Sequence, residues 1–192
     1  MTLSARPFEF LKPAITWFNV DMDNKKTATT TTYETDTGTY YYYTESDELR
    51  RGIELSVSGK ISDFGVTTYK FGWTRMMKIE STSGGVTTDS TGVTNPKNLF
   101  TVMLAQKWRA YSANVTVRTV DDWTDSSTGV TGLGGYTRVD VNVQRDFVIR
   151  DHRLNVAIYS RNLTNERYAT RYKTGYYYDR GLVIGTQLTF EF

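Results

Sequence analysis

Two groups of tyrosines are the residues of this chain best suited to bind a ligand. Residues 40–43 are four consecutive tyrosines, and residues 176–178 are three more, close to Arg171, Lys173 and Arg180. Aromatic rings stack on flat ligands and attract cations, and the basic residues add positive charge. Both groups are predicted to lie in loops, and the candidate ligand-binding residues are Tyr40, Tyr41, Tyr42, Tyr43, Arg171, Lys173, Tyr176, Tyr177 and Tyr178.

Other kinds of chemistry find little support in the composition. The chain has no cysteine and one histidine, His152, so disulfides and Cys or His metal clusters are excluded. His152 could act as a general base, but no nucleophile motif lies near it, and a residue of a tight turn is the preferred interpretation. We therefore expect no enzyme activity, no cofactor and no metal. A net charge of +2 without a basic cluster gives no indication of nucleic-acid binding.

The elements that must position these residues are predicted to be β-strands. Mean hydropathy is −0.47, and no run approaches the roughly 20 apolar residues that a transmembrane helix needs. Instead, apolar and polar residues alternate with the period of two that is typical of strands. Eight strands are predicted, at about residues 7–20, 48–61, 63–78, 97–107, 110–121, 134–148, 152–162 and 180–192.

The connections between these strands alternate in length. Tight turns are predicted near residues 62–63, 108–109 and 150–151, and long polar loops at residues 21–47, 81–94, 122–132 and 164–178. Short periplasmic turns and long extracellular loops are typical of outer-membrane barrels. The predicted fold is one domain, residues 1–192: an all-β antiparallel meander forming a transmembrane β-barrel of about eight strands.

The direction of the apolar faces remains open in the sequence. In a soluble up-and-down barrel the apolar face points inward, whereas in a membrane barrel it points to lipid. The loop pattern and the charged opposite faces favour outer-membrane lipid as the partner of the apolar face. The residues then predicted to face lipid are Ile53, Leu55, Val115, Val117, Val139, Val141, Val143, Leu154, Val156, Ile158, Leu188 and Phe190. In that setting the tyrosine groups have an alternative role, as an interfacial aromatic girdle.

Five ordered segments resemble the C-terminal part of TonB-dependent outer-membrane receptors. They are residues 17–23 (WFNVDMD), 51–55 (RGIEL), 135–141 (GYTRVDV), 162–168 (NLTNERY) and the closing strand from Gly185 to Phe192. The resemblance implies a bacterial outer-membrane location and uptake of a siderophore, vitamin or oligosaccharide. Nothing in the chain resembles the plug domain of these receptors, so a plug domain or the remaining barrel strands are expected as partners. The alternative is a small closed eight-stranded barrel with a structural or loop-mediated binding role and no energised transport.

The last strand carries a further expectation from this resemblance. Gly185, Leu188, Phe190 and Phe192 are similar to the signal that the barrel-assembly machinery reads in the family. That machinery would pair with the exposed edge of the strand. The alternative is that Phe192 only anchors the strand at the interface.

Overall fold

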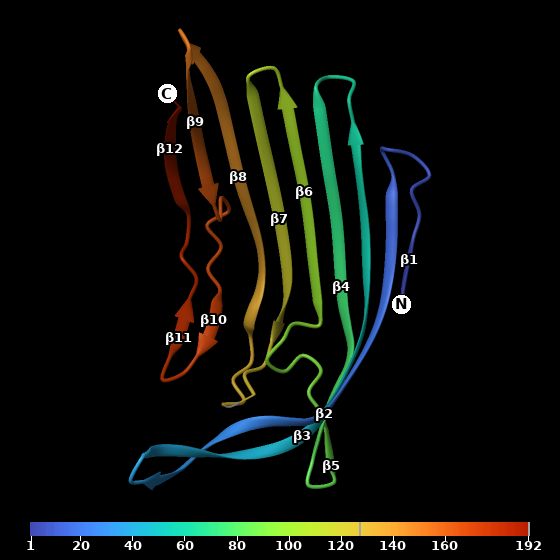
Figure 1. Ribbon diagram of the computed structural model, residues 1–192, viewed down its shortest axis with the longest axis vertical. Helices are drawn as coiled ribbons and strands as arrows, with labels where there is room; N and C mark the ends of the chain where they lie inside the picture. The colour runs from blue at the N-terminus through green and yellow to red at the C-terminus, as the bar shows by residue number, and fades with distance from the viewer. Residues whose placement is uncertain (127, 192) are drawn as a thin grey trace.

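The computed structural model describes residues 1–126 and 128–191, which form strands, turns and loops (Figure 1). Within these residues no helix is long and apolar enough to cross a membrane. The strands are β1 (Thr2–Ser4), β2 (Lys12–Thr35), β3 (Gly38–Ile61), β4 (Val66–Ser83), β5 (Val86–Asp89), β6 (Asn98–Trp108), β7 (Tyr111–Trp123), β8 (Leu133–Ile149), β9 (His152–Arg161), β10 (Ala169–Tyr172), β11 (Tyr176–Tyr178) and β12 (Val183–Glu191).

Most of the strands belong to one antiparallel meander in the order β1-β2-β3-β4-β6-β7-β8-β9-β12. β5 pairs with β4 as a short extension, and β10 pairs with β11 in a separate two-stranded sheet. β1 and β12 form the two edges of the large sheet and lie at opposite sides of Figure 1. The predicted all-β antiparallel meander is confirmed. The sheet is open, however, and no pairing of β1 with β12 closes it within the part of the chain that the structure describes.

The strand predictions are accurate at the tight turns and wrong at the opposite end of the sheet. Residues 21–47 were expected to be a loop, but β2 and β3 continue through them as paired strands and turn only at residues 36–37. Residues 81–94 and 164–178 likewise contain β5 and the β10–β11 hairpin, and β1 was not expected. These segments are rich in Thr and Tyr, which favour strands although they are polar. The expectation of a loop followed polarity and neglected this preference.

The expected tight turns lie together at one end of the sheet, and the connections β4–β6, β7–β8 and β9–β12 lie at the other (Figure 1). At that second end, β2 and β3 are joined by a turn at residues 36–37 and not by the expected long loop. Residues 62–65, 109–110 and 150–151 make the short turns at the upper end of the view. Arg109 and Arg150 open two of them in the left-handed region, with φ of 53° and 57°. Such values are uncommon for residues with a Cβ and allow the chain to reverse within two residues.

The strand registers bring the predicted apolar stripes of the main strands onto one face. Val102 of β6 lies opposite Val117 of β7, which lies opposite Val139 of β8. The same face continues to β12, where Leu188 lies opposite Val156. All twelve residues predicted to face lipid therefore share this face, which we call the apolar face. The opposite face carries the alternating polar and charged residues and is called the polar face.

The small core lies on the polar face, near the end with the long connections. It consists of Val120, Tyr136 and Tyr168, with Leu99 and Trp123 packed against it. Val120 and Tyr136 are opposed residues of β7 and β8, and Tyr168 comes from the connection between β9 and β12. Its ring stacks on that of Tyr136 at 3.8 Å between centroids. The segment 162–182 therefore folds over the polar face, and the apolar face receives no such cover from the described residues.

Candidate functional site

The two predicted tyrosine groups occupy separate hairpins. Residues 40–43 lie on β3, in the part of the β2–β3 hairpin that extends beyond the rest of the sheet (Figure 1). Residues 176–178 form β11, which pairs with β10 below β9 and β12 in the same view. No contact joins β10 or β11 to β2 or β3 in the described chain. The structure therefore does not bring the predicted ligand-binding residues together into one site.

On the β2–β3 hairpin, the tyrosines alternate between the two faces. Tyr33 of β2 stacks on Tyr40 at 5.5 Å and contacts Tyr42 at 5.0 Å, so these three rings form a row on one face. Tyr41 and Tyr43 point to the other face and are 53% and 62% exposed. These rings are accessible to a binding partner.

On the β10–β11 hairpin, the aromatic rings already have cationic partners within the chain. The Arg171 guanidinium lies 4.7 Å from the centre of the Tyr177 ring, and that of Arg167 lies 4.5 Å from Tyr178. Tyr176 meets Tyr172 edge to face at 5.1 Å. Lys173 is exposed near the turn. The combination of cations and rings expected from the sequence is present here, and its use by a ligand stays a prediction.

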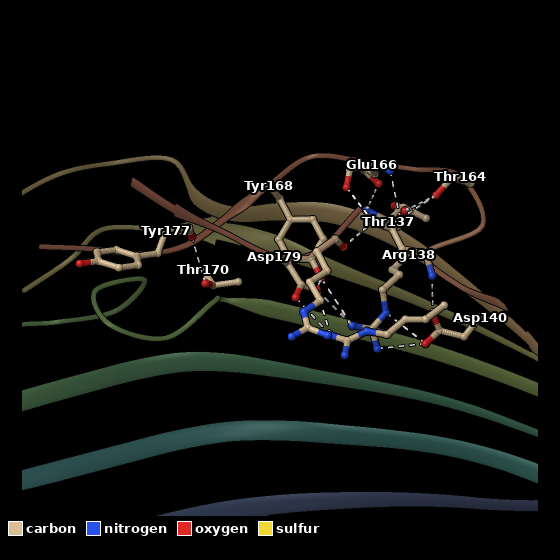
Figure 2. A network of polar contacts seen from close by, with 12 residues as sticks. Thr137, Arg138, Asp140, Thr164, Glu166, Tyr168, Thr170, Tyr177 and Asp179 are labelled. Carbon is tan, nitrogen blue, oxygen red and sulfur yellow. Dashed lines mark hydrogen bonds and ion pairs between the residues drawn. The ribbon is translucent and has the colours of Figure 1, made fainter. Parts of the chain in front are cut away.

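A partly buried polar network, which the sequence did not predict, lies between this hairpin and the sheet (Figure 2). Arg138 of β8 donates from Nε to Asp140 at 3.1 Å, and its guanidinium also lies 3.7 Å from Asp179. Arg161 of β9 forms a second ion pair with Asp179 at 3.0 Å. The Tyr168 hydroxyl donates to the same carboxylate. Two arginines and one tyrosine thus converge on Asp179 and hold the connection against β8 and β9.

Asn162 is the residue that fixes the path of this connection. It is fully buried, with φ of 54°, and every polar group of its amide side chain is bonded. The Nδ2 group donates to the carbonyls of Glu166 at 2.8 Å and Arg180 at 3.3 Å, and Oδ1 accepts from the Glu166 N–H at 3.0 Å. Its own backbone N–H donates to Asp140 at 2.9 Å. The segment 162–168 noted in the sequence is thus a structural latch onto the polar face.

The contacts between Tyr168 of this latch and Asp179 favour an ionised Asp179 and a protonated Tyr168. Burial alone would raise the pKa of Asp179, but hydrogen bonds from Tyr168 and the Arg180 backbone, with the charge of Arg161, hold that pKa below its ordinary value. Burial and the nearby carboxylate raise the pKa of the Tyr168 hydroxyl. Asp179 is thus a stable anion and Tyr168 a stable donor. The groups are satisfied by one another, which suits a structural role better than catalysis.

A second cluster lines an open polar cavity of about 310 Å³ near the same end of the sheet. Glu48 of β3 is 5% exposed and forms ion pairs with Lys25 through Oε2 and with Arg50 through Oε1. The other polar side chains that line the cavity come from several elements and carry neutral donors and acceptors: Ser81, Ser90, Thr94, Asn95 and Ser126. Such a lining suits a small polar ligand. The sequence did not indicate this cavity, because Lys25 lies in a segment expected to be a loop.

The other described residues singled out in the sequence, His152 and those of the last strand, do not join either tyrosine group. His152 begins β9, and its ring lies 5.6 Å from the Phe190 ring. Gly185 is an edge residue of β12 that lies against the Tyr159 ring, where an added Cβ would overlap the ring. Leu188 and Phe190 are on the apolar face, and Phe192 lies outside the described residues. Among the residues that the structure describes, no group of three or more His, Cys, Asp and Glu side chains could hold a metal ion.

No protein-family model matches the chain, and no curated protein matches it.

Proposed function

We propose that this chain forms part of the wall of a bacterial outer-membrane β-barrel of the TonB-dependent receptor type. Its short turns would face the periplasm and its long connections the outside. The observation that carries the proposal is the continuous apolar face of the sheet, bounded by aromatic residues at two levels. The lipid of the outer membrane is the environment that suits such a face.

The apolar face is extensive and uncovered. Leu104, Val143, Ile158 and Leu188, spread from β6 to β12, are between 47% and 70% exposed. The described residues expose 13517 Å² in total, whereas a compact monomer of 22.0 kDa would expose roughly 9,300 Å². In a soluble barrel this face would be buried inside. Here the core that the described residues form lies on the opposite, polar face, which supports lipid as the partner.

Aromatic side chains bound the apolar face at two levels. Trp73 and Phe100 stack at 5.9 Å towards the long connections, and Trp108 and Tyr111 stack at 6.1 Å beside the short turns. Phe100 and Trp108 are eight residues apart on β6, which corresponds to about 27 Å along a strand and, for a strand tilted by about 40°, to roughly 20 Å across the membrane. Outer-membrane barrels have an apolar band about 25 Å tall between two aromatic girdles. These residues fit the girdle role better than the projecting tyrosines at positions 40–43.

Strand direction favours a larger barrel over a small closed one. Neighbours in the meander are antiparallel throughout, so β1 and β12, the first and ninth of its strands, run in the same direction. Direct pairing of these edges would be parallel, whereas bacterial outer-membrane barrels are antiparallel with an even strand number. An antiparallel barrel that keeps β1 needs an odd number of further strands. This supports the wall of a larger receptor, whose cargo would be a siderophore, vitamin or oligosaccharide.

Lipid contact can be tested with single cysteines, because the chain has none of its own. A polarity-sensitive fluorophore would be attached in turn to positions 139, 141 and 143 of β8, and to positions 140, 142 and 144 as matched controls. After folding into vesicles with brominated lipid, we expect quenching at the odd positions only. Quenching at the even positions, or at neither set, would contradict the membrane assignment.

Transport requires a separate test, because a structural barrel would give the same quenching pattern. The chain would be assembled with the strands and plug domain that complete a receptor, and uptake would be measured in cells with and without TonB. Uptake that requires both TonB and the plug domain is the expected result. Unchanged uptake without either would contradict the receptor type while leaving the membrane wall intact.

A further inference from the structure

The distal part of the β2–β3 hairpin, residues 25–46, is here called the tyrosine arm. In this arm β2 and β3 pair with each other alone, since the pairing of β3 with β4 begins at Asp47 and β1 reaches β2 only at residues 14–16. The arm projects from the end of the sheet as a two-stranded ribbon (Figure 1). On the β3 side the Glu45 carbonyl accepts a hydrogen bond from the Ser83 hydroxyl of β4 at 3.1 Å. Beyond that contact, the outer edge of each strand has no strand partner among the described residues.

The two outer edges differ in regularity. On the β2 side the register shifts between Ala28 and Thr32, so that residues 29–31 stand opposite a single residue of β3. This bulge interrupts that edge. On the β3 side, residues 38–46 continue without a bulge, and residues 37–44 include no Lys, Arg, Asp, Glu or Pro. Proteins normally protect free edges with such residues or with bulges. The β3 edge is therefore the one open to strand addition.

From these features we propose that the β3 edge of the tyrosine arm pairs with the same edge of a second copy of this chain. Two identical antiparallel edges are related by a two-fold axis perpendicular to the ribbon, so opposed residues share a face. The axis can pass at Tyr41, which places Tyr40 opposite Tyr42 of the partner. It can equally pass at Tyr42, which places Tyr41 opposite Tyr43 of the partner. Both registers bring tyrosine against tyrosine.

The chemistry of the edge suits a second copy. Because residues 37–44 carry no charge, self-pairing brings no like charges together. The ring row of Tyr33, Tyr40 and Tyr42 would continue across the two-fold axis into the equivalent row of the second copy. Aromatic pairs across strands stabilise a sheet, and tyrosine loses little side-chain freedom when it is ordered. The inference does not depend on the membrane proposal, since the arm lies beyond both aromatic levels of the apolar face.

Disulfide formation in single-cysteine variants tests the pairing directly. We would oxidise Tyr41→Cys and Tyr42→Cys in the full chain, with Thr32→Cys as the matched control. Thr32 is the direct partner of Tyr41 on the bulged strand and is also exposed. Opposed residues of an antiparallel pair have Cα atoms about 4.5–5.5 Å apart, within the range of a disulfide. We expect covalent dimers from at least one of the two tyrosine positions and none above background from Thr32→Cys.

A second measurement separates specific pairing from collision. The equilibrium dimer fraction of the cysteine-free chain would be measured by sedimentation in detergent, for the parent, Tyr41→Lys and Thr32→Lys. With the axis at Tyr41, we expect Tyr41→Lys to weaken dimerisation by a factor of roughly three to five, because like charges would then face each other at the axis. With the axis at Tyr42, Tyr42→Lys, measured alongside, should have this effect instead. Thr32→Lys should leave dimerisation unchanged. A monomeric parent, or equal disulfide yields at all three positions, would overturn the inference. Binding of another polypeptide or a glycan to the arm, without self-association of the chain, would overturn it as well.

Discussion

Single residues in this protein act mainly by fixing the close approach of neighbouring segments. Asn162 does so with hydrogen bonds, which satisfy carbonyls from two parts of the connection to β12. Gly185 does so by its lack of a side chain, which leaves room for the Tyr159 ring on the adjacent strand. A substitution at either position should therefore displace the segment that packs against it.

Replacing Gly185 by alanine should destabilise the edge strand. The new Cβ would overlap the Tyr159 ring, which must then leave its place over β12. We expect the free energy of unfolding in urea to fall by about 1 kcal/mol, within the usual range for a packing change. Gly72→Ala on β4 is the matched control, because a Cβ there meets nothing within 4 Å. If both variants unfold alike, the ring contact does not stabilise β12.

Low pH should weaken the attachment of the latch to the polar face, because it protonates Asp179, which accepts a hydrogen bond from Tyr168 of the latch. The pKa of this carboxyl is lower in the folded protein than in the unfolded chain. Its contribution to the free energy of unfolding is therefore complete above the pKa of the unfolded chain, near pH 4. The contribution is lost as the pH falls further, through the folded pKa. In Asp179→Asn, unfolding measured by near-ultraviolet circular dichroism should depend less on pH below about 4. An identical pH dependence in Asp179→Asn and the parent would contradict this role, and Asp151→Asn in the exposed turn is the control.

At the scale of elements, each main strand separates two environments. The alternation seen in β8 gives Val139, Val141 and Val143 to the apolar face, and Arg138 and Asp140 to the polar network. The two faces should therefore respond differently to the same substitution at adjacent positions.

Arginine at position 141 should be costly and arginine at position 142 mild. In a folded membrane barrel, a charge at mid-membrane on the lipid face costs about 2–4 kcal/mol. Asn142 is on the polar face of the same strand, one residue away, so it matches the position along β8. Urea unfolding of vesicle-folded protein would compare Val141→Arg with Asn142→Arg. Equal tolerance of the two substitutions would mean that the faces have been assigned wrongly.

For the molecule as a whole, the decisive property is that the sheet has two edges. Edges exposed to lipid leave backbone groups without hydrogen-bond partners, which the hydrocarbon region does not tolerate. β1 occupies part of the β2 edge, at residues 14–16, and runs in the same direction as β12. The chain with β1 in place therefore lacks an antiparallel way to close on itself.

Removal of residues 1–6 should accordingly favour closure of the isolated chain. Without β1, the β2 edge becomes free along its whole length, and β2 and β12 run in opposite directions. We expect the shortened chain to give more of a compact monomer, detected by a change in gel mobility between unheated and heated samples. A full-length chain that already gives this species in equal yield would contradict the argument from strand direction. It would favour the small closed barrel.

The strand faces and the tight turns follow from local sequence. Alternation is a local property: once a segment is extended, Val139 and Val141 must share a face whatever lies beside them. The tight turns are equally local, since two residues at Arg109 or Arg150 reverse the chain. Where the sequence failed, in residues 21–47, polarity was taken as a sign of a loop although Thr and Tyr favour strands.

The neighbours of each face and edge depend on contacts between segments that are distant in the sequence. The convergence of Arg138, Arg161 and Tyr168 on Asp179 joins residues up to 41 positions apart, and no local pattern specifies that partnership. The Glu48 cavity likewise depends on Lys25 being brought alongside by strand pairing. The open sheet follows from the order and direction of the strands, which depend on the pairing of distant segments. Local sequence sets the direction of each side chain, while long-range pairing sets what that side chain meets.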